Sequence, residues 1–254
     1  MSKIKEVDSF FEELTNRALG EFAKIDPIGI TTKRKWDTEL GLMEVRLFMG
    51  EVFEKAGVSY SALKIKLPNT DTEADVRVFE ILTYMANPKV PTLAISLRYR
   101  ANGGEKFMGL CDISPSIAID EDLDYFGQAM KGLCEKHGKK YDDMLKRLNY
   151  LFTSKHTGKT VLGGRGIAFD LEDDGFDFFK EFGELFLDTS LEIIKRRKGE
   201  EFTLRDKDKQ LHDRGKWVEF NLTEDKGFIL GVKVGIPPEA MNYQTLPPVA
   251  KFYP

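Results

Sequence analysis

The spacing of apolar side chains along the chain predicts where helices and strands lie. From about Glu6 to Lys24 the apolar residues recur at helical spacing on one broad stripe, which predicts an amphipathic helix. The residues of this stripe are Phe10, Phe11, Leu14, Ala18, Leu19 and Phe22. Further along, Val58–Lys66 alternates with a period of two and Val76–Met85 is rich in branched and aromatic residues, so both are expected to be strands.

A central hairpin is expected between Asn87 and Pro115. Leu93, Ile95, Leu97 and Tyr99 alternate with smaller or polar residues, as in a half-buried strand. Residues 101–104 (Ala-Asn-Gly-Gly) tolerate the positive φ angles of a tight turn, after which residues 107–113 can return antiparallel.

The hairpin would set Arg98 on one strand near Asp112 on its neighbour. A cation and a carboxylate that face one cleft could hold an anionic substrate together with its N–H groups. The alternative is a cross-strand ion pair, which is common and contributes little to stability when it is exposed. The spacing alone leaves both interpretations open.

The middle of the chain returns to helical spacing. One helix is expected to begin at Asp120–Asp122, because carboxylates are favourable at the positive end of the helix dipole. Two more are expected at Tyr141–Phe152 and Phe176–Lys195, with a short strand at Ile167–Leu171 between them. The many phenylalanines of the last helix indicate core packing rather than a cofactor site.

The C-terminal part is expected to hold a charged helix and a second hairpin. Phe202–Arg214 alternates acids and bases, as a solvated helix does. Trp217–Leu222 and Phe228–Val234 are expected to be strands joined by a turn at Asp225–Gly227. Strands early and late with helices between them favour an α+β fold, with a large, mostly antiparallel sheet in one domain of residues 1–254.

Composition excludes several classes of protein. The 254 residues are 41% hydrophobic, enough for one substantial core, and the formal charge of -4 leaves no basic footprint for nucleic acid. The N-terminus carries acids where a signal peptide needs an apolar run, and no stretch is apolar enough to span a bilayer. We therefore expect no membrane partner and a cytoplasmic location.

Cysteine and histidine are too sparse for a disulfide framework or a metal site rich in these residues. Cys111 and Cys134 are the only cysteines, which suits a reducing compartment. The three histidines, His137, His156 and His212, are widely spaced, so no metal is expected.

Seven stretches in the same order resemble the oxygen-dependent coproporphyrinogen III oxidase family, and they cover nearly the whole chain from about Trp36. They are FEKAGVSYS (53–61), NPKVPT leading to Arg98-Tyr99, CDISP (111–115), KH with GGRGIAFD (155–170), FLDTSLEIIKRRK (186–198), DRGKWVEFNLTEDKG (213–227) and LPP (246–248).

The resemblance implies a large antiparallel sheet with helices on both faces, usually in a homodimer. It also implies a cleft in which a tetrapyrrole loses propionate carboxyl groups to leave vinyl groups, with molecular oxygen as co-substrate and no other cofactor. In that family the residues matching Arg98 and Asp112 are the proposed catalytic pair. The resemblance thus implies that Arg98 holds a substrate carboxylate, which a guanidinium can match bidentately, and that Asp112 accepts pyrrole N–H bonds.

Other positions depart from the family pattern. Histidines are replaced by Ala94, Asp124 and Phe126, an asparagine by Ser96, and arginines by Thr157, Leu162 and Lys226. A carboxylate clamp near the C-terminus has become Gly235–Pro238. Four propionates facing so few cations would be costly to desolvate. A pyrrole-like or related heteroaromatic carboxylic acid, or a tetrapyrrole with fewer acid groups, suits the cleft better than coproporphyrinogen.

These observations predict an oxygen-dependent, cofactor-free oxidase, of the oxidative decarboxylase type, that acts on such a small molecule. Arg98 and Asp112 are the predicted catalytic residues. The predicted substrate-binding residues are Ser96, His156, Arg165 and Lys226. A lone histidine is more often a structural hydrogen-bonding group, and Arg165 could equally be a surface substitution. The alternatives are a non-catalytic tetrapyrrole or pigment carrier on this scaffold, and a genuine coproporphyrinogen III oxidase.

Overall fold

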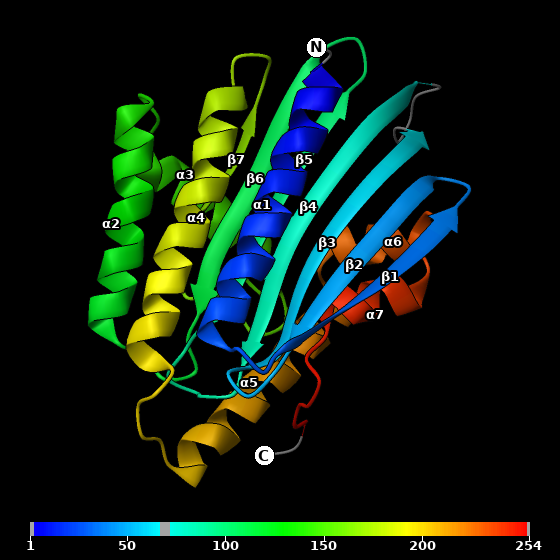
Figure 1. Cartoon of the computed structure of the whole chain (residues 1–254). Helices are drawn as coiled ribbons and strands as arrows, with labels where there is room; N and C mark the ends of the chain where they lie inside the picture. Colours follow the sequence, from blue (N-terminus) through cyan, green and yellow to red (C-terminus); the bar gives the residue numbers. More distant parts are fainter. Residues whose placement is uncertain (1–2, 67–71, 253–254) are drawn as a thin grey trace.

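A single antiparallel sheet forms the centre of the protein (Figure 1). The computed structural model describes residues 3–66 and 72–252. In these residues seven strands lie side by side in chain order, and each pairs antiparallel with its neighbours. They are β1 (Ile30–Thr38), β2 (Gly41–Met49), β3 (Phe53–Lys66), β4 (Glu73–Met85), β5 (Thr92–Ala101), β6 (Glu105–Ser114) and β7 (Ile167–Leu171). The predicted α+β class is confirmed.

The central hairpin predicted from the sequence is β5–β6. Ala101 pairs with Glu105 across the turn, and Gly103 adopts a φ of 83°, a region that favours glycine. Leu97 and Cys111 are fully buried and belong to the main core on one face of this hairpin. The intervening residues of each strand therefore face the opposite side of the sheet.

Three helices cover the first face of the sheet, where the main core lies (Figure 1). They are α1 (Lys3–Ile25), α2 (Asp120–Lys136) and α4 (Phe176–Arg197). Fully buried rings of α1, β4 and α4 meet there: the Phe11 ring centroid lies 5.4 Å from that of Phe79 and 5.8 Å from that of Phe179. The phenylalanines of α4 thus pack the core, as the sequence predicted.

The second face is covered by the C-terminal helices α5 (Leu204–Thr223), α6 (Lys226–Lys233) and α7 (Pro238–Thr245), while α3 (Tyr141–Phe152) lies against β7. A smaller core forms where Phe152 of α3 packs on Phe220 of α5 beside Leu162 and Ala168. Helices therefore flank both faces. No helix among the described residues is long and apolar enough to cross a membrane.

The predicted C-terminal hairpin is wrong, because both of its segments are helical. Trp217 and Phe220 are three residues apart, so on a helix both rings reach Phe152. The expected turn is a helix start instead: the Asp225 carboxylate accepts a hydrogen bond from Phe228 N at 2.6 Å and caps α6. Aromatic and branched residues favour strands only weakly, and tertiary packing overrides that preference here.

The start of α5 offers a local test of the fold. Thr203 and Asp206 form a reciprocal capping box there, with Asp206 N donating to Thr203 Oγ1 and Thr203 N donating to Asp206 Oδ2. We expect Thr203→Ala to lower the free energy of unfolding by about 1 kcal/mol in urea denaturation. Thr203→Ser keeps the capping oxygen and should stay close to wild type; equal losses in both variants would contradict the capping role.

Candidate active site

A cluster of three polar side chains lies on the second face of the sheet, where β4 and β5 pair. Glu80 of β4 is directly opposite Ser96 of β5, and Arg98 follows two residues later on the same face. Ser96 Oγ donates to Glu80 Oε1 at 2.9 Å and accepts from Arg98 Nε at 3.1 Å. Arg98 Nη2 lies 3.4 Å from Glu80 Oε1. The guanidinium is thus held in one orientation while 40% of the Arg98 side chain stays exposed.

The first turn of α6 adjoins this guanidinium. A Cβ placed on Gly227 would lie 3.2 Å from Arg98 Nη2, so the α6 backbone approaches the guanidinium closely at this residue. Lys226, the residue before, is exposed and extends its ammonium to 5.4 Å from the Tyr150 ring centroid. Arg98, with Lys226 on the adjoining turn, favours a bound anion such as a carboxylate, whereas the start of α6 itself is already capped by the Asp225 carboxylate.

Asp112 has a different environment, because its carboxylate is fully buried against the glycine-rich loop before β7. Gly164 N donates to Oδ2 at 2.7 Å, while Gly166 N and Arg165 N donate to Oδ1 at 2.9 and 3.3 Å. Ile113 N donates to Oδ1 at 2.9 Å. The Asp112 carboxylate therefore binds four backbone N–H groups of its own chain.

The close approach of this loop depends on glycine. A Cβ on Gly166 would lie 1.8 Å from Cys111 O, and one on Gly163 would lie 2.2 Å from Ile113 O, distances at which atoms overlap. Burial raises the pKa of Asp112 to about 6, although the four backbone N–H groups act in the opposite direction. Near neutral pH the carboxylate is still mostly ionised.

The expected proximity of Arg98 and Asp112 needs a correction. Both side chains lie on the second face of the sheet, but Arg98 is opposite Met108 and Asp112 is opposite Ala94. Four residues of strand separate them, roughly 13 Å at the usual rise per residue. Among the described residues Arg98 forms its ion pair with Glu80, so the cross-strand pair with Asp112 considered from the sequence does not form.

The other predicted substrate-binding residues lie in two places. His156 is exposed on a loop bound to the end of α5, where Ser154 Oγ and Lys155 N each donate to the Glu224 carboxylate at 2.6 Å. Glu224 directly precedes the cap of α6, so this loop approaches the Arg98 side of the site. Arg165 instead extends toward α2, where its Nη2 lies 3.8 Å from Asp124 Oδ1. The structure does not bring Arg165 to the Arg98 cluster.

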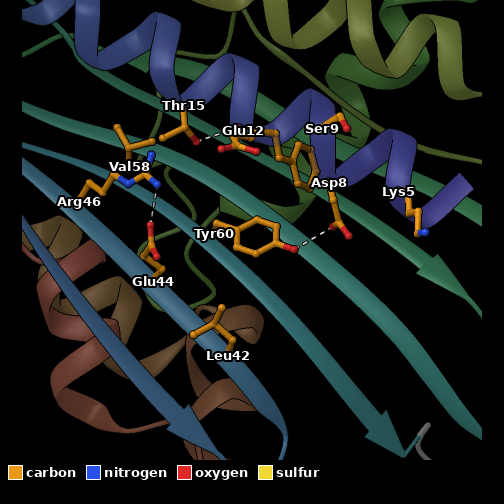
Figure 2. A pocket seen from close by; sticks show the side chains of 11 residues that line it. Lys5, Asp8, Ser9, Glu12, Thr15, Leu42, Glu44, Arg46, Val58 and Tyr60 are labelled. Atoms are coloured by element: carbon orange, nitrogen blue, oxygen red, sulfur yellow. Dashed lines mark hydrogen bonds and ion pairs between the residues drawn. The ribbon is translucent and has the colours of Figure 1, made fainter.

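A separate groove of about 460 Å³ lies on the opposite, α1 face of the sheet (Figure 2). Its charges are largely paired with one another: Glu44 contacts Lys33 and Arg46, and Asp8 accepts a hydrogen bond from Tyr60. Burial raises the pKa of Glu44, but the surrounding cations outweigh this and hold it below its ordinary value. None of the residues predicted to bind substrate lines this groove.

Metal and thiol chemistry find little support in the part of the chain that the structure describes. No three or more His, Cys, Asp or Glu residues there are grouped to hold a metal ion. Cys111 and Cys134 are buried free thiols, and burial raises the pKa of Cys134 to about 11. A thiol with so high a pKa is a poor nucleophile near neutral pH.

Comparison with known proteins settles the family. The model of the family described as coproporphyrinogen III oxidase matches residues 6–253. The chain belongs to the coproporphyrinogen III oxidase family. An enzyme of Francisella tularensis subsp. novicida named oxygen-dependent coproporphyrinogen-III oxidase is 31% identical over 225 residues, which cover 80% of this chain and 72% of the relative. The relative of the same name from Francisella philomiragia is 32% identical over 223 residues, which cover 79% and 72%.

Membership of the coproporphyrinogen III oxidase family confirms the resemblance read from the seven stretches. Two of the apolar departures from the family pattern are buried: Phe126 lies fully buried against Phe186, and Leu162 lies in the smaller core. At these two positions the side chain packs in an apolar core. Glu80 was not predicted from the sequence, although a lone acid in the apolar run Val76–Met85 was a usable signal.

Proposed function

We propose that this member of the coproporphyrinogen III oxidase family is an oxygen-dependent oxidative decarboxylase of a pyrrole-like or related heteroaromatic carboxylic acid. The observation that carries the proposal is the half-exposed Arg98 guanidinium, oriented by Ser96 and Glu80 next to the start of α6. Such a fork matches a substrate carboxylate. Lys226, and His156 on the adjoining loop, would supply further contacts.

The proposed reaction removes one propionate carboxyl. The carbon–carbon bond to the carboxylate breaks to release CO₂, one hydrogen leaves the neighbouring carbon, and the side chain becomes a vinyl group. The two electrons reduce O₂ to hydrogen peroxide, which takes one proton from the substrate and one from solvent. An electron-rich ring can give electrons to O₂ directly, so the protein need only bind, orient and exclude water. We propose no metal and no organic cofactor.

Two other functions remain as alternatives, each with its own support. The two Francisella relatives are named coproporphyrinogen-III oxidases, which favours that substrate for this chain as well. The saturated Asp112 carboxylate favours a carrier of a tetrapyrrole or other pigment, because all four of its hydrogen bonds are made within the chain.

Oxygen uptake distinguishes the three candidate functions. Purified protein is incubated with a metabolite extract, and separately with coproporphyrinogen III, under air and under nitrogen. We expect one heteroaromatic acid to disappear only under air, with matching oxygen uptake, and coproporphyrinogen III to bind with a Kd well above about 1 μM. Rapid conversion of coproporphyrinogen III would establish the genuine oxidase. A ligand retained without oxygen uptake would establish the carrier.

We further propose that residues 1–254 form one domain, that two copies form a homodimer, and that the protein works in the cytoplasm without membrane or nucleic-acid partners. Sedimentation velocity of the purified protein tests the homodimer directly. A monomer at micromolar concentration would contradict it.

A further inference from the structure

We propose that Glu80, rather than Asp112, is the carboxylate that accepts the ring N–H of a substrate bound to Arg98. This inference rests on the proposed function, because it assumes that Arg98 holds a substrate carboxylate. It narrows the substrate to a heteroaromatic acid that carries one carboxylate within reach of one ring N–H.

The carboxylates of Asp112 and Glu80 differ in whether an oxygen is left to accept a hydrogen bond from a ligand. Asp112 is fully buried, and both of its oxygens already accept backbone N–H groups. The Glu80 side chain is 29% exposed. Its hydrogen bonds and its ion pair with other described residues are all made through Oε1. Oε2 of Glu80 can therefore accept a further N–H, whereas Asp112 would first have to lose its loop.

The position of Glu80 also fixes which ligands it favours. Its Oε1 lies 3.4 Å from Arg98 Nη2, so a ligand carboxylate on that guanidinium would lie next to a second negative charge. The cost of this repulsion grows with the number of carboxylates that the ligand brings. A ring N–H aimed at Glu80 has the opposite effect, because a hydrogen bond to a charged group is among the stronger ones. The Glu80–Arg98 pair thus selects for one carboxylate and one N–H.

The test compares two matched probes, indole-3-propionate and 1-benzofuran-3-propionate, which differ in the ring N–H. Binding to the whole protein is measured by calorimetry without turnover. Wild type should bind the indole about tenfold more tightly, the usual difference for a charge-assisted hydrogen bond. Glu80→Gln keeps the size of the side chain and should reduce this preference at least threefold. The same variant should bind coproporphyrin III at least threefold more tightly, because this ligand brings four carboxylates while its two N–H groups point to the centre of the macrocycle, away from Glu80.

The matched control is Glu172→Gln, which removes an exposed carboxylate near β6 and should leave all three affinities at their wild-type values. If Glu80→Gln does not fold, Glu80→Asp replaces it. The shorter side chain withdraws the acceptor but keeps the charge, so the indole preference should fall without a gain in coproporphyrin affinity.

Two results would overturn the inference. One is a wild-type protein that does not prefer the indole, and the other is a Glu80 variant that keeps the full preference. Either result leaves the oxygen-uptake test of the proposed function untouched. Conversely, a protein that prefers the indole through Glu80 but consumes no oxygen would overturn the proposed activity alone.

Discussion

Asp112→Asn should destabilise the protein by about 2 to 3 kcal/mol at pH 7. The amide that replaces one carboxylate oxygen points N–H groups at backbone N–H groups of Gly164 or Gly166, and buried donors without an acceptor are costly. A carboxylate that served only as a catalytic residue would be expected to affect chemistry with little change in stability. The buried loop contacts revise that expectation. Urea denaturation followed by circular dichroism measures the difference.

The control for this variant is Asp124→Asn, an exposed acid on α2, which should change stability by less than about 0.5 kcal/mol. A change in Asp112→Asn as small as this would mean that the loop does not depend on the carboxylate.

The same pair of proteins should respond differently to pH. The folded-state pKa of Asp112, about 6, lies above the ordinary value of 3.8, so between these values the folded protein binds more protons than the unfolded chain. The wild type therefore gains stability from this group as the pH falls from 7 to 4, by about 2 kcal/mol, because the full effect of the shift is reached only below the unfolded-state pKa. Asparagine does not titrate. The gap between wild type and Asp112→Asn should widen on acidification, and a narrowing gap would show that the pKa is depressed instead.

Arg98→Lys should lower kcat/KM at least about thirtyfold on the substrate found by oxygen uptake, although the charge is kept. The guanidinium is oriented through Nε by Ser96 and through Nη2 by Glu80. An ammonium keeps neither the fork nor this geometry, so the carboxylate would be bound by a single mobile charge. Because the side chain is 40% exposed, the melting temperature should change little.

Arg34→Lys provides the control, since Arg34 is exposed on the edge strand β1 and belongs to no part of the site. A folded Arg98→Lys variant that turns over at more than half the wild-type rate would place the carboxylate-binding group elsewhere.

Most of the sheet could be predicted from the sequence because alternation is a local signal. The turn at residues 101–104 also carries the register: pairing Ala101 with Glu105 places Arg98 opposite Met108. Counting back from the turn would thus have corrected the expected contact with Asp112. The pairing of Glu80 with Ser96 is harder to predict from the sequence, because the segment between β4 and β5 is not a two-residue turn that would fix the register.

The surroundings of Asp112 were beyond sequence reasoning for a different reason. The carboxylate is bound by N–H groups more than fifty residues further along the chain. Every residue except proline has a backbone N–H, so the residue types do not reveal which of these groups bind a carboxylate. The glycines of the loop indicated a close approach of some kind. They did not indicate which atom is approached.

The serial order of the strands has a consequence for how the molecule folds. Each strand from β2 to β6 pairs with the strand before it, so this part can grow by successive hairpins with short loops to close. β7 pairs with β6, but the connection between them is long and contains α2 and α3. Closing this connection therefore costs more chain entropy than closing a hairpin loop. Arg98 and Glu80 lie on β5 and β4 and can be assembled early. The enclosure of Asp112 has to wait for β7, so the strands around Arg98 and the loop around Asp112 should acquire protection from hydrogen exchange at different times during refolding.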